Sequence, residues 1–137
     1  MHFDASLIAS ARWWTTSHRQ VRDKEEGLTH SGAVNGDIDL TLVIMRFQAT
    51  DVDRLLAVLS RYVVLTRGHA GCRNVDLALS SIDPERVVVV QKWESPAAQR
   101  THFDSDDMVE MARAATALLR SPPDIDLLDG VSAHDLR

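Results

Sequence analysis

The chain has 137 residues, of which 45% are hydrophobic and 26% are charged, and its formal net charge is −5. This length and composition predict one globular domain, with some chain left over for an extension. An acidic chain without a basic stripe does not suit a nucleic-acid backbone or an anionic membrane surface. We therefore exclude nucleic acids and membranes as partners.

The single cysteine, Cys72, cannot form a disulfide bond within the chain. The first residues include Asp4 and Arg12 and contain no long apolar run, so they lack the form of a signal peptide or a membrane span. We expect a cytoplasmic protein.

The sequence contains none of the common short motifs for a metal or a nucleotide. The six histidines are scattered, without an HxH, HxxxH or HExxH pair. The glycine-rich motifs GxGxxG and GxxxxGK[ST] and the serine motif GxSxG are also missing. We expect no metal, nucleotide or flavin cofactor.

Residues 1–36 differ in pattern from the rest of the chain. Apolar residues recur at helical spacing, which predicts an amphipathic helix within residues 4–26. We interpret residues 1–36 as an extension, anchored on the domain or on a partner subunit by Trp13 and Trp14. A partly disordered leader is the alternative. The domain itself then comprises residues 37–137.

From residue 38 onward, strand patterns alternate with helix patterns. A capping box at Thr50 and Asp53 marks the start of the first helix of the domain. Ser95 and Ser105 are the expected caps of two later helical stretches. In chain order, the predicted elements are a strand at 38–47, a helix at 51–66, strands at 74–79 and 87–93, helical stretches at 96–103 and 106–120, and a strand near 125–127.

This order, β-α-β-β-α-β, is typical of a ferredoxin-like α+β fold, in which helices cover one face of an antiparallel sheet. The third strand contains four consecutive valines, residues 87–90, and is therefore apolar on both faces. Since helices cover only one face in this topology, we expect a second copy of the chain to cover the other. The sequence thus predicts a homodimer.

Several short motifs carry a resemblance to a known family. The stretch from about residue 40 to residue 131 resembles the antibiotic-biosynthesis monooxygenase family, whose members are dimeric α+β barrels. The matching pieces are Gly71-Cys72, Asp83-Pro84, the valine strand leading into Trp93-Glu94-Ser95, and His102 nine residues after the tryptophan. Ala70 stands where the family usually has proline.

Within this family, residues 86–121 are most similar to the cofactor-free enzyme that oxidises anthrones in actinorhodin biosynthesis. In an ungapped alignment, Trp93 and Arg113 match a tryptophan and an arginine of that enzyme's pocket. Val89 stands in place of a pocket asparagine, and Gln99 stands in place of a pocket tyrosine. The resemblance covers about two thirds of the chain and speaks more strongly for the fold than for the reaction.

The resemblance implies a cofactor-independent monooxygenase that uses O₂ to oxidise a small electron-rich aromatic of quinol or anthrone type. In such an enzyme the substrate loses a proton, and its anion reacts directly with O₂. Arg113 would hold a developing oxyanion, Trp93 would stack on the ring or donate its indole N–H, and His102 would be the base.

Each of these residues also has a structural interpretation: Trp93 in the core, Arg113 in a surface or interface ion pair, and His102 in capping or packing. A non-catalytic ligand-binding or interaction module of the same fold is therefore the alternative function. Haem degradation, which related barrels perform, is a weaker candidate, because the asparagine, tryptophan and histidine of that pocket have no counterparts at the corresponding positions.

Overall fold

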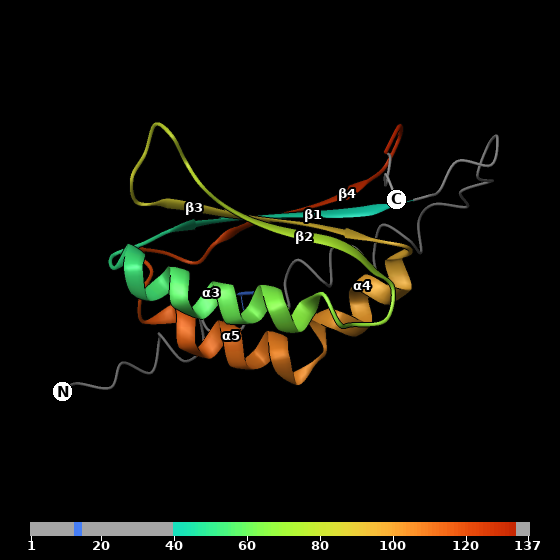
Figure 1. Ribbon diagram of the computed structural model, residues 1–137, viewed down its shortest axis with the longest axis horizontal. Coiled ribbons are helices and arrows are strands. Elements are labelled where there is room, and N and C mark those ends of the chain that lie inside the picture. The colour runs from blue at the N-terminus through green and yellow to red at the C-terminus, as the bar shows by residue number, and fades with distance from the viewer. Residues whose placement is uncertain (1–12, 15–39, 134–137) are drawn as a thin grey trace.

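The computed structural model describes residues 13–14 and 40–133 (Figure 1). Its sheet has the strand order β2-β3-β1-β4, with every neighbouring pair antiparallel. The helices lie together on one face of this sheet (Figure 1). The ferredoxin-like prediction is confirmed. The elements are β1 (Thr41–Gln48), α3 (Val52–Thr66), β2 (Cys72–Leu79), β3 (Arg86–Trp93), α4 (Pro96–Phe103), α5 (Asp106–Thr116) and β4 (Asp124–Asp129).

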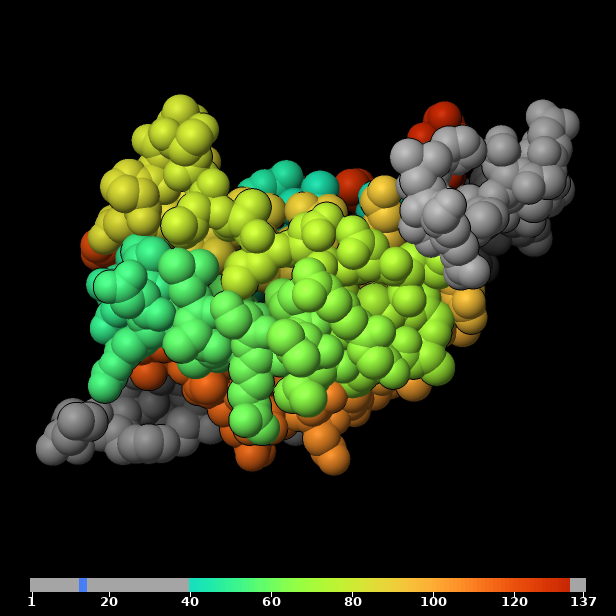
Figure 2. Space-filling model, viewed as in Figure 1, coloured from blue at the N-terminus to red at the C-terminus, as the bar shows by residue number. Residues whose placement is uncertain are grey.

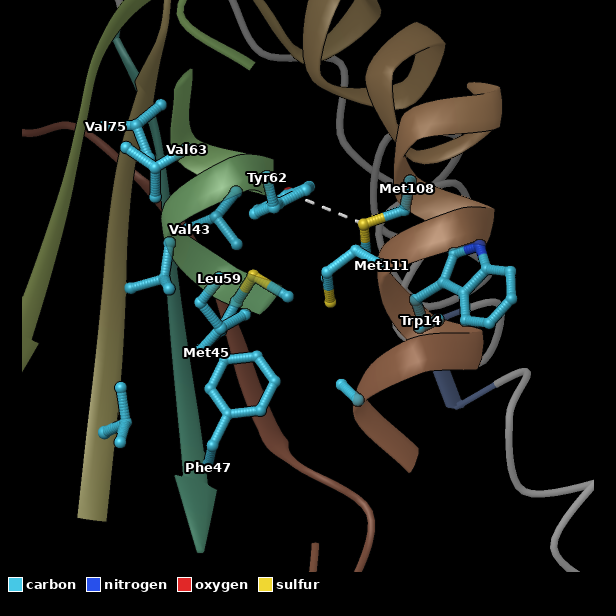
Figure 3. Packing of buried hydrophobic residues seen from close by; sticks show 14 of the residues in the cluster. Trp14, Val43, Met45, Phe47, Leu59, Tyr62, Val63, Val75, Met108 and Met111 are labelled. Carbon is cyan, nitrogen blue, oxygen red and sulfur yellow. Dashed lines mark hydrogen bonds between the residues drawn. The ribbon is translucent and has the colours of Figure 1, made fainter. Parts of the chain in front are cut away.

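The two faces of β3 separate as the alternation of a pleated strand requires. Residues 87, 89, 91 and 93 are buried against the helices, and residues 88, 90 and 92 are half-buried on the opposite face. On the helix side, β1 contributes Met45 and Phe47 to the main hydrophobic core, while α3 contributes Leu59 (Figure 3). The core therefore lies between the sheet and the helices.

The helix caps follow the sequence with one displacement. Ser95 and Ser105 accept hydrogen bonds from the backbone N–H groups three residues later, as predicted. At α3, however, the cap is Asp51 and not Thr50, because the extended backbone at Asp51 brings its carboxylate to the N–H of Arg54. The capping box predicted at Thr50 and Asp53 is therefore wrong by one residue.

Helix α5 is shorter than predicted. It ends at Thr116, because the chain beyond it forms backbone bonds with the end of β1. The Leu118 carbonyl accepts from the N–H of Thr50, and the N–H of Arg120 donates to the carbonyl of Gln48. These bonds replace the helical continuation up to residue 120.

The space-filling view shows α3 side by side with β2 on one side of the molecule, and the turn between β2 and β3 projecting on the side of the sheet away from the helices (Figure 2). Trp14 is buried in the core cluster. Trp13 packs edge-on against Trp14 and Phe47, with ring centroids 5.6 Å and 6.1 Å away. The two tryptophans thus pack on the domain, as expected of anchors. The rest of the helix predicted within residues 4–26 lies outside the described residues, and the domain boundary at 36/37 stays a prediction.

Candidate functional site

A chain of hydrogen bonds joins buried polar side chains beneath the sheet. On β3, the indole Nε1 of Trp93 donates to Oε1 of Gln91 over 2.8 Å. These two residues share the helix-facing side of the strand, because they are two positions apart. Nε2 of Gln91 then donates to the hydroxyl of Tyr62 on α3 over 2.7 Å.

The same chain continues through both histidines of the domain's interior to a carboxylate. The Tyr62 hydroxyl lies 2.6 Å from Nε2 of His102 on α4, and Nδ1 of His102 lies 3.0 Å from Nδ1 of His69. Nε2 of His69 lies 2.7 Å from Oδ2 of Asp107 on α5. His102 is buried, whereas the side chains of His69 and Asp107 are 21% and 30% exposed. We call this hydrogen-bonded set the polar chain; its members, in order, are Trp93, Gln91, Tyr62, His102, His69 and Asp107.

The backbone holds the two histidines next to each other. His69 lies in the loop between α3 and β2, and this loop ends at Gly71, whose φ of 82° suits glycine. A Cβ atom at Gly71 would lie 2.5 Å from the Cβ of Ala98 on α4. The Gly71 carbonyl also accepts from the N–H of Glu94 over 2.9 Å. The loop that carries His69 is therefore packed directly on the helix that carries His102.

The donors and acceptors of the polar chain fix its direction when both histidines are neutral. The amide nitrogen of Gln91 can only donate, so the Tyr62 oxygen accepts from it. If Tyr62 in turn donates to Nε2 of His102, then His102 carries its proton on Nδ1 and donates it to Nδ1 of His69. His69 then carries its own proton on Nε2, toward the Asp107 carboxylate. Each of these contacts thus has one donor and one acceptor.

Burial keeps the middle of the polar chain uncharged. Burial, with a smaller contribution from His69, lowers the pKa of His102 to about 3, while Asp107 acts in the opposite direction. Burial also raises the pKa of the Tyr62 hydroxyl. At neutral pH both groups are therefore neutral. The pKa of the Cys72 thiol is raised by burial too, which fits a packed side chain and not a nucleophile.

The structure brings together two of the predicted catalytic residues, Trp93 and His102. Their rings stack with centroids 4.8 Å apart and an interplanar angle of 26°. Trp93 is fully buried. Arg113, in contrast, lies on the exposed side of α5, since the buried stripe of that helix consists of Met108, Met111, Ala112 and Ala115. Among the described residues, Arg113 makes no hydrogen bond or ion pair with the polar chain.

The two predicted pocket residues are both buried. Val89 is on the helix-facing side of β3, two positions before Gln91. Gln99 is on α4, one turn before His102, and its side-chain oxygen and nitrogen find no hydrogen-bond partner within the described part of the chain. A buried amide without partners is uncommon in folded proteins, so Gln99 is a natural contact for a polar group of a bound molecule.

Four members of the polar chain were missed by the sequence analysis: Gln91, Tyr62, His69 and Asp107. Two of them left a signal. Gln91 is a polar residue at an inward position of an otherwise apolar strand, and Tyr62 lies on the apolar stripe of its helix. His69 and Asp107 left none, because their meeting depends on how the loop and α5 pack.

A cavity of about 70 Å³ lies between α3 and α5. Tyr62 and Asp107 of the polar chain are among its lining residues, whereas Trp93, Gln99 and Arg113 are not. Figure 3 shows Tyr62 pointing from α3 toward Met108 on α5, with the 3.5 Å contact from its hydroxyl to the methionine sulfur drawn as a dashed line. One side of the polar chain thus reaches the space between these helices.

Among the described residues there is neither a cluster of metal ligands nor a membrane span. Within residues 13–14 and 40–133, no three His, Cys, Asp or Glu side chains are grouped so that they could hold a metal ion. No helix in the same part of the chain has both the length and the apolar character needed to cross a membrane.

Comparison with known proteins places this geometry in a family. No curated protein sequence matches the chain. Among solved structures, Rv0793 from Mycobacterium tuberculosis is 27% identical with a TM-score of 0.63, over 69% of this chain and 97% of that one. PA3566 from Pseudomonas aeruginosa is 25% identical with a TM-score of 0.61, over 72% and 100%. A structure described as an antibiotic biosynthesis monooxygenase shares the fold, with 24% identity and a TM-score of 0.62 over 66% and 98%.

The family model for antibiotic biosynthesis monooxygenases matches residues 41–114. The matched segment begins with β1 and ends near the end of α5, so it contains every member of the polar chain. It also spans more than half of the 137 residues. The chain therefore belongs to the antibiotic biosynthesis monooxygenase family.

Proposed function

We propose that this protein is a cofactor-independent monooxygenase that oxidises a small electron-rich aromatic, of quinol or anthrone type, with O₂. The observation that carries the proposal is the polar chain, in a member of this family, that connects the stacked Trp93 and His102 to the carboxylate of Asp107. An acidic aromatic must lose a proton before it reacts with O₂, and this chain offers a built route for that proton.

The reaction balances without an outside reductant. For an anthrone-type substrate, a ring CH₂ group becomes a carbonyl: one atom of O₂ forms the new C=O bond, and the other leaves as water with the two hydrogens. The substrate supplies all the electrons that O₂ accepts. The protein needs only to remove a proton, exclude bulk water and stabilise the anion.

The residues divide this work as follows. His102, neutral and stacked on Trp93, receives the proton through Tyr62, and the unpaired amide of Gln99 binds a substrate oxygen. The cavity of about 70 Å³ is smaller than the roughly 150 Å³ that holds a benzene ring in an apolar interior. Substrate binding therefore requires side chains or α4 to move. Arg113 can hold a developing oxyanion, as predicted, only if the substrate reaches the exposed side of α5.

Oxygen uptake tests the proposal directly. The full chain, stripped of metals with a chelator, is mixed with a panel of hydroquinones and anthrones, and we expect O₂ consumption with one atom of isotopically labelled O₂ incorporated into the quinone product. Trp93→Phe and His102→Gln should lower turnover while circular dichroism shows an unchanged fold, and Arg113→Ala measures the contribution of the arginine. No uptake with any compound, together with thermal shifts on ligand binding, would instead identify a non-catalytic binding module.

We also propose that the protein is a homodimer whose two sheets face each other. The face of the sheet opposite the helices carries Leu42, Ile44, Val88 and Val90, all partly exposed in the single chain. If the same face of a second copy covers these side chains, the apolar surface of both copies is removed from water at once. Light scattering after size-exclusion chromatography should give twice the chain mass, and a single monomeric species would contradict the proposal.

A further inference from the structure

We propose that His69 and Asp107 form the proton-holding end of a relay, which takes the substrate's proton through Tyr62 and His102 and returns it when water leaves. The inference rests on the proposed function, because it assigns a task within the same reaction. Neither residue is among the catalytic residues predicted from the sequence. Their role follows from the order of the hydrogen bonds.

The transfers can occur in sequence without moving a heavy atom. The substrate proton goes to the Tyr62 oxygen as the Tyr62 proton goes to Nε2 of His102, 2.6 Å away. The Nδ1 proton of His102 then goes to Nδ1 of His69, 3.0 Å away. The substrate becomes an anion, His69 becomes a cation, and Tyr62 and His102 are neutral before and after.

The position of the charge explains why two histidines are needed. A cation on His102 would be buried, and the low pKa of this imidazole shows how poorly that position holds a proton. On His69 the cation is 2.7 Å from the carboxylate of Asp107 and partly exposed to water. Asp107 also lies in the first turn of α5, so the helix fixes the backbone position from which its carboxylate reaches His69.

The relay also restores itself. After the first transfer, His69 carries protons on both nitrogens and His102 carries its proton on Nε2, so every hydrogen bond from Tyr62 to His69 points in the reverse direction. The Tyr62 hydroxyl then donates toward the substrate. When the oxygen–oxygen bond breaks, the proton passes back along the same bonds to the leaving oxygen, and the resting arrangement returns without net exchange with solvent.

Turnover of variants of the full chain provides the first test. His69→Ala and Asp107→Asn should each lower kcat by roughly 10²-fold, the size of effect expected for a proton-transfer group. Added imidazole should restore part of the activity of His69→Ala but not of Asp107→Asn. Asp106→Asn is the matched control, because it removes a charge from the same helical turn without touching the polar chain. If His69→Ala does not fold, His69→Gln keeps two hydrogen bonds but cannot hold the proton, and it should be equally slow.

Full turnover in His69→Gln and Asp107→Asn, with an active wild type, would overturn the relay and leave the proposed function standing. A second test does not need turnover. The ring-nitrogen chemical shifts of the wild type above neutral pH should show His102 protonated on Nδ1 and His69 protonated on Nε2. His102 protonated on Nε2 would overturn the relay whatever the activity. A wild type that consumes no O₂ would overturn the proposed function first, and the catalytic use of the relay with it.

Discussion

On the face of β3 that the helices cover, Val87, Val89 and Trp93 are fully buried, and Gln91 among them is satisfied by hydrogen bonds on both ends of its amide. On the other face of the same strand, Val88 and Val90 remain partly exposed. On the helix-covered face, the hydrogen bonds of the polar chain offset the cost of burying the amide of Gln91. On the bare face these apolar side chains have no cover, and this difference is the basis of the proposed homodimer.

The largest expected effect comes from a carboxylate placed on either face of β3. Val89→Asp would bury an unpaired charge at a cost of about 5 kcal/mol or more, comparable with the whole stability of a small domain. We expect this variant to be unfolded by circular dichroism. Val90→Asp, one residue away on the bare face, should fold and be monomeric in light scattering. If both variants fold, or both unfold, the distinction between the two faces is wrong.

An intermediate effect is expected from pH and concerns the helix-covered face alone. Burial lowers the pKa of His102 from 6.5 to about 3, so between these values the unfolded chain binds a proton that the folded chain does not. The free energy of unfolding therefore falls as the pH drops below the pKa of His102 in the unfolded chain, by roughly 2 kcal/mol between about pH 7 and about pH 5. His102→Gln cannot titrate and should lose that much less over the same interval. Urea unfolding of both proteins measures the difference, and equal losses would show that His102 is not buried as a neutral group.

The smallest effect belongs to the bare face. Arg46 on β1 forms an ion pair with Asp126 on β4 over 2.6 Å, and both side chains are more than a third exposed. In the Val90→Asp background, where no second copy covers the pair, Asp126→Asn should change the unfolding free energy by less than about 1 kcal/mol. A loss of several kcal/mol in otherwise wild-type protein would show that the dimer buries this pair.

Much of the fold could be predicted because its signals are local. The valine run, the serine caps and the position of Pro96 each act within a few residues, and they gave the order of elements and the two faces of β3. The errors were also local. Asp51 replaced Thr50 as a cap, and α5 ended early because backbone bonds to β1, from a distant part of the sequence, competed with the helix.

The site was less predictable because its members come from separate elements. Trp93 and His102 were found through family resemblance, and the structure stacks their rings on each other. The pairs that complete the polar chain are far apart in sequence: Tyr62 and His102 by 40 positions, and His69 and Asp107 by 38. No spacing rule joins such residues. Arg113 shows the converse, since its match in an ungapped alignment did not place it on the buried side of α5.

Gly71 determines how closely the loop of His69 packs on α4. Because Gly71 has no side chain, the loop of His69 rests against Ala98. This loop and α4 therefore pack together and hold the two imidazoles in contact. Tyr62 and Asp107 belong to other helices. If α4 and this loop move together to admit a substrate, the hydrogen bonds to Tyr62 and to Asp107 break, while the contact between the two histidines is kept. The relay would then be interrupted while the substrate enters, and it would be complete only after α4 has returned.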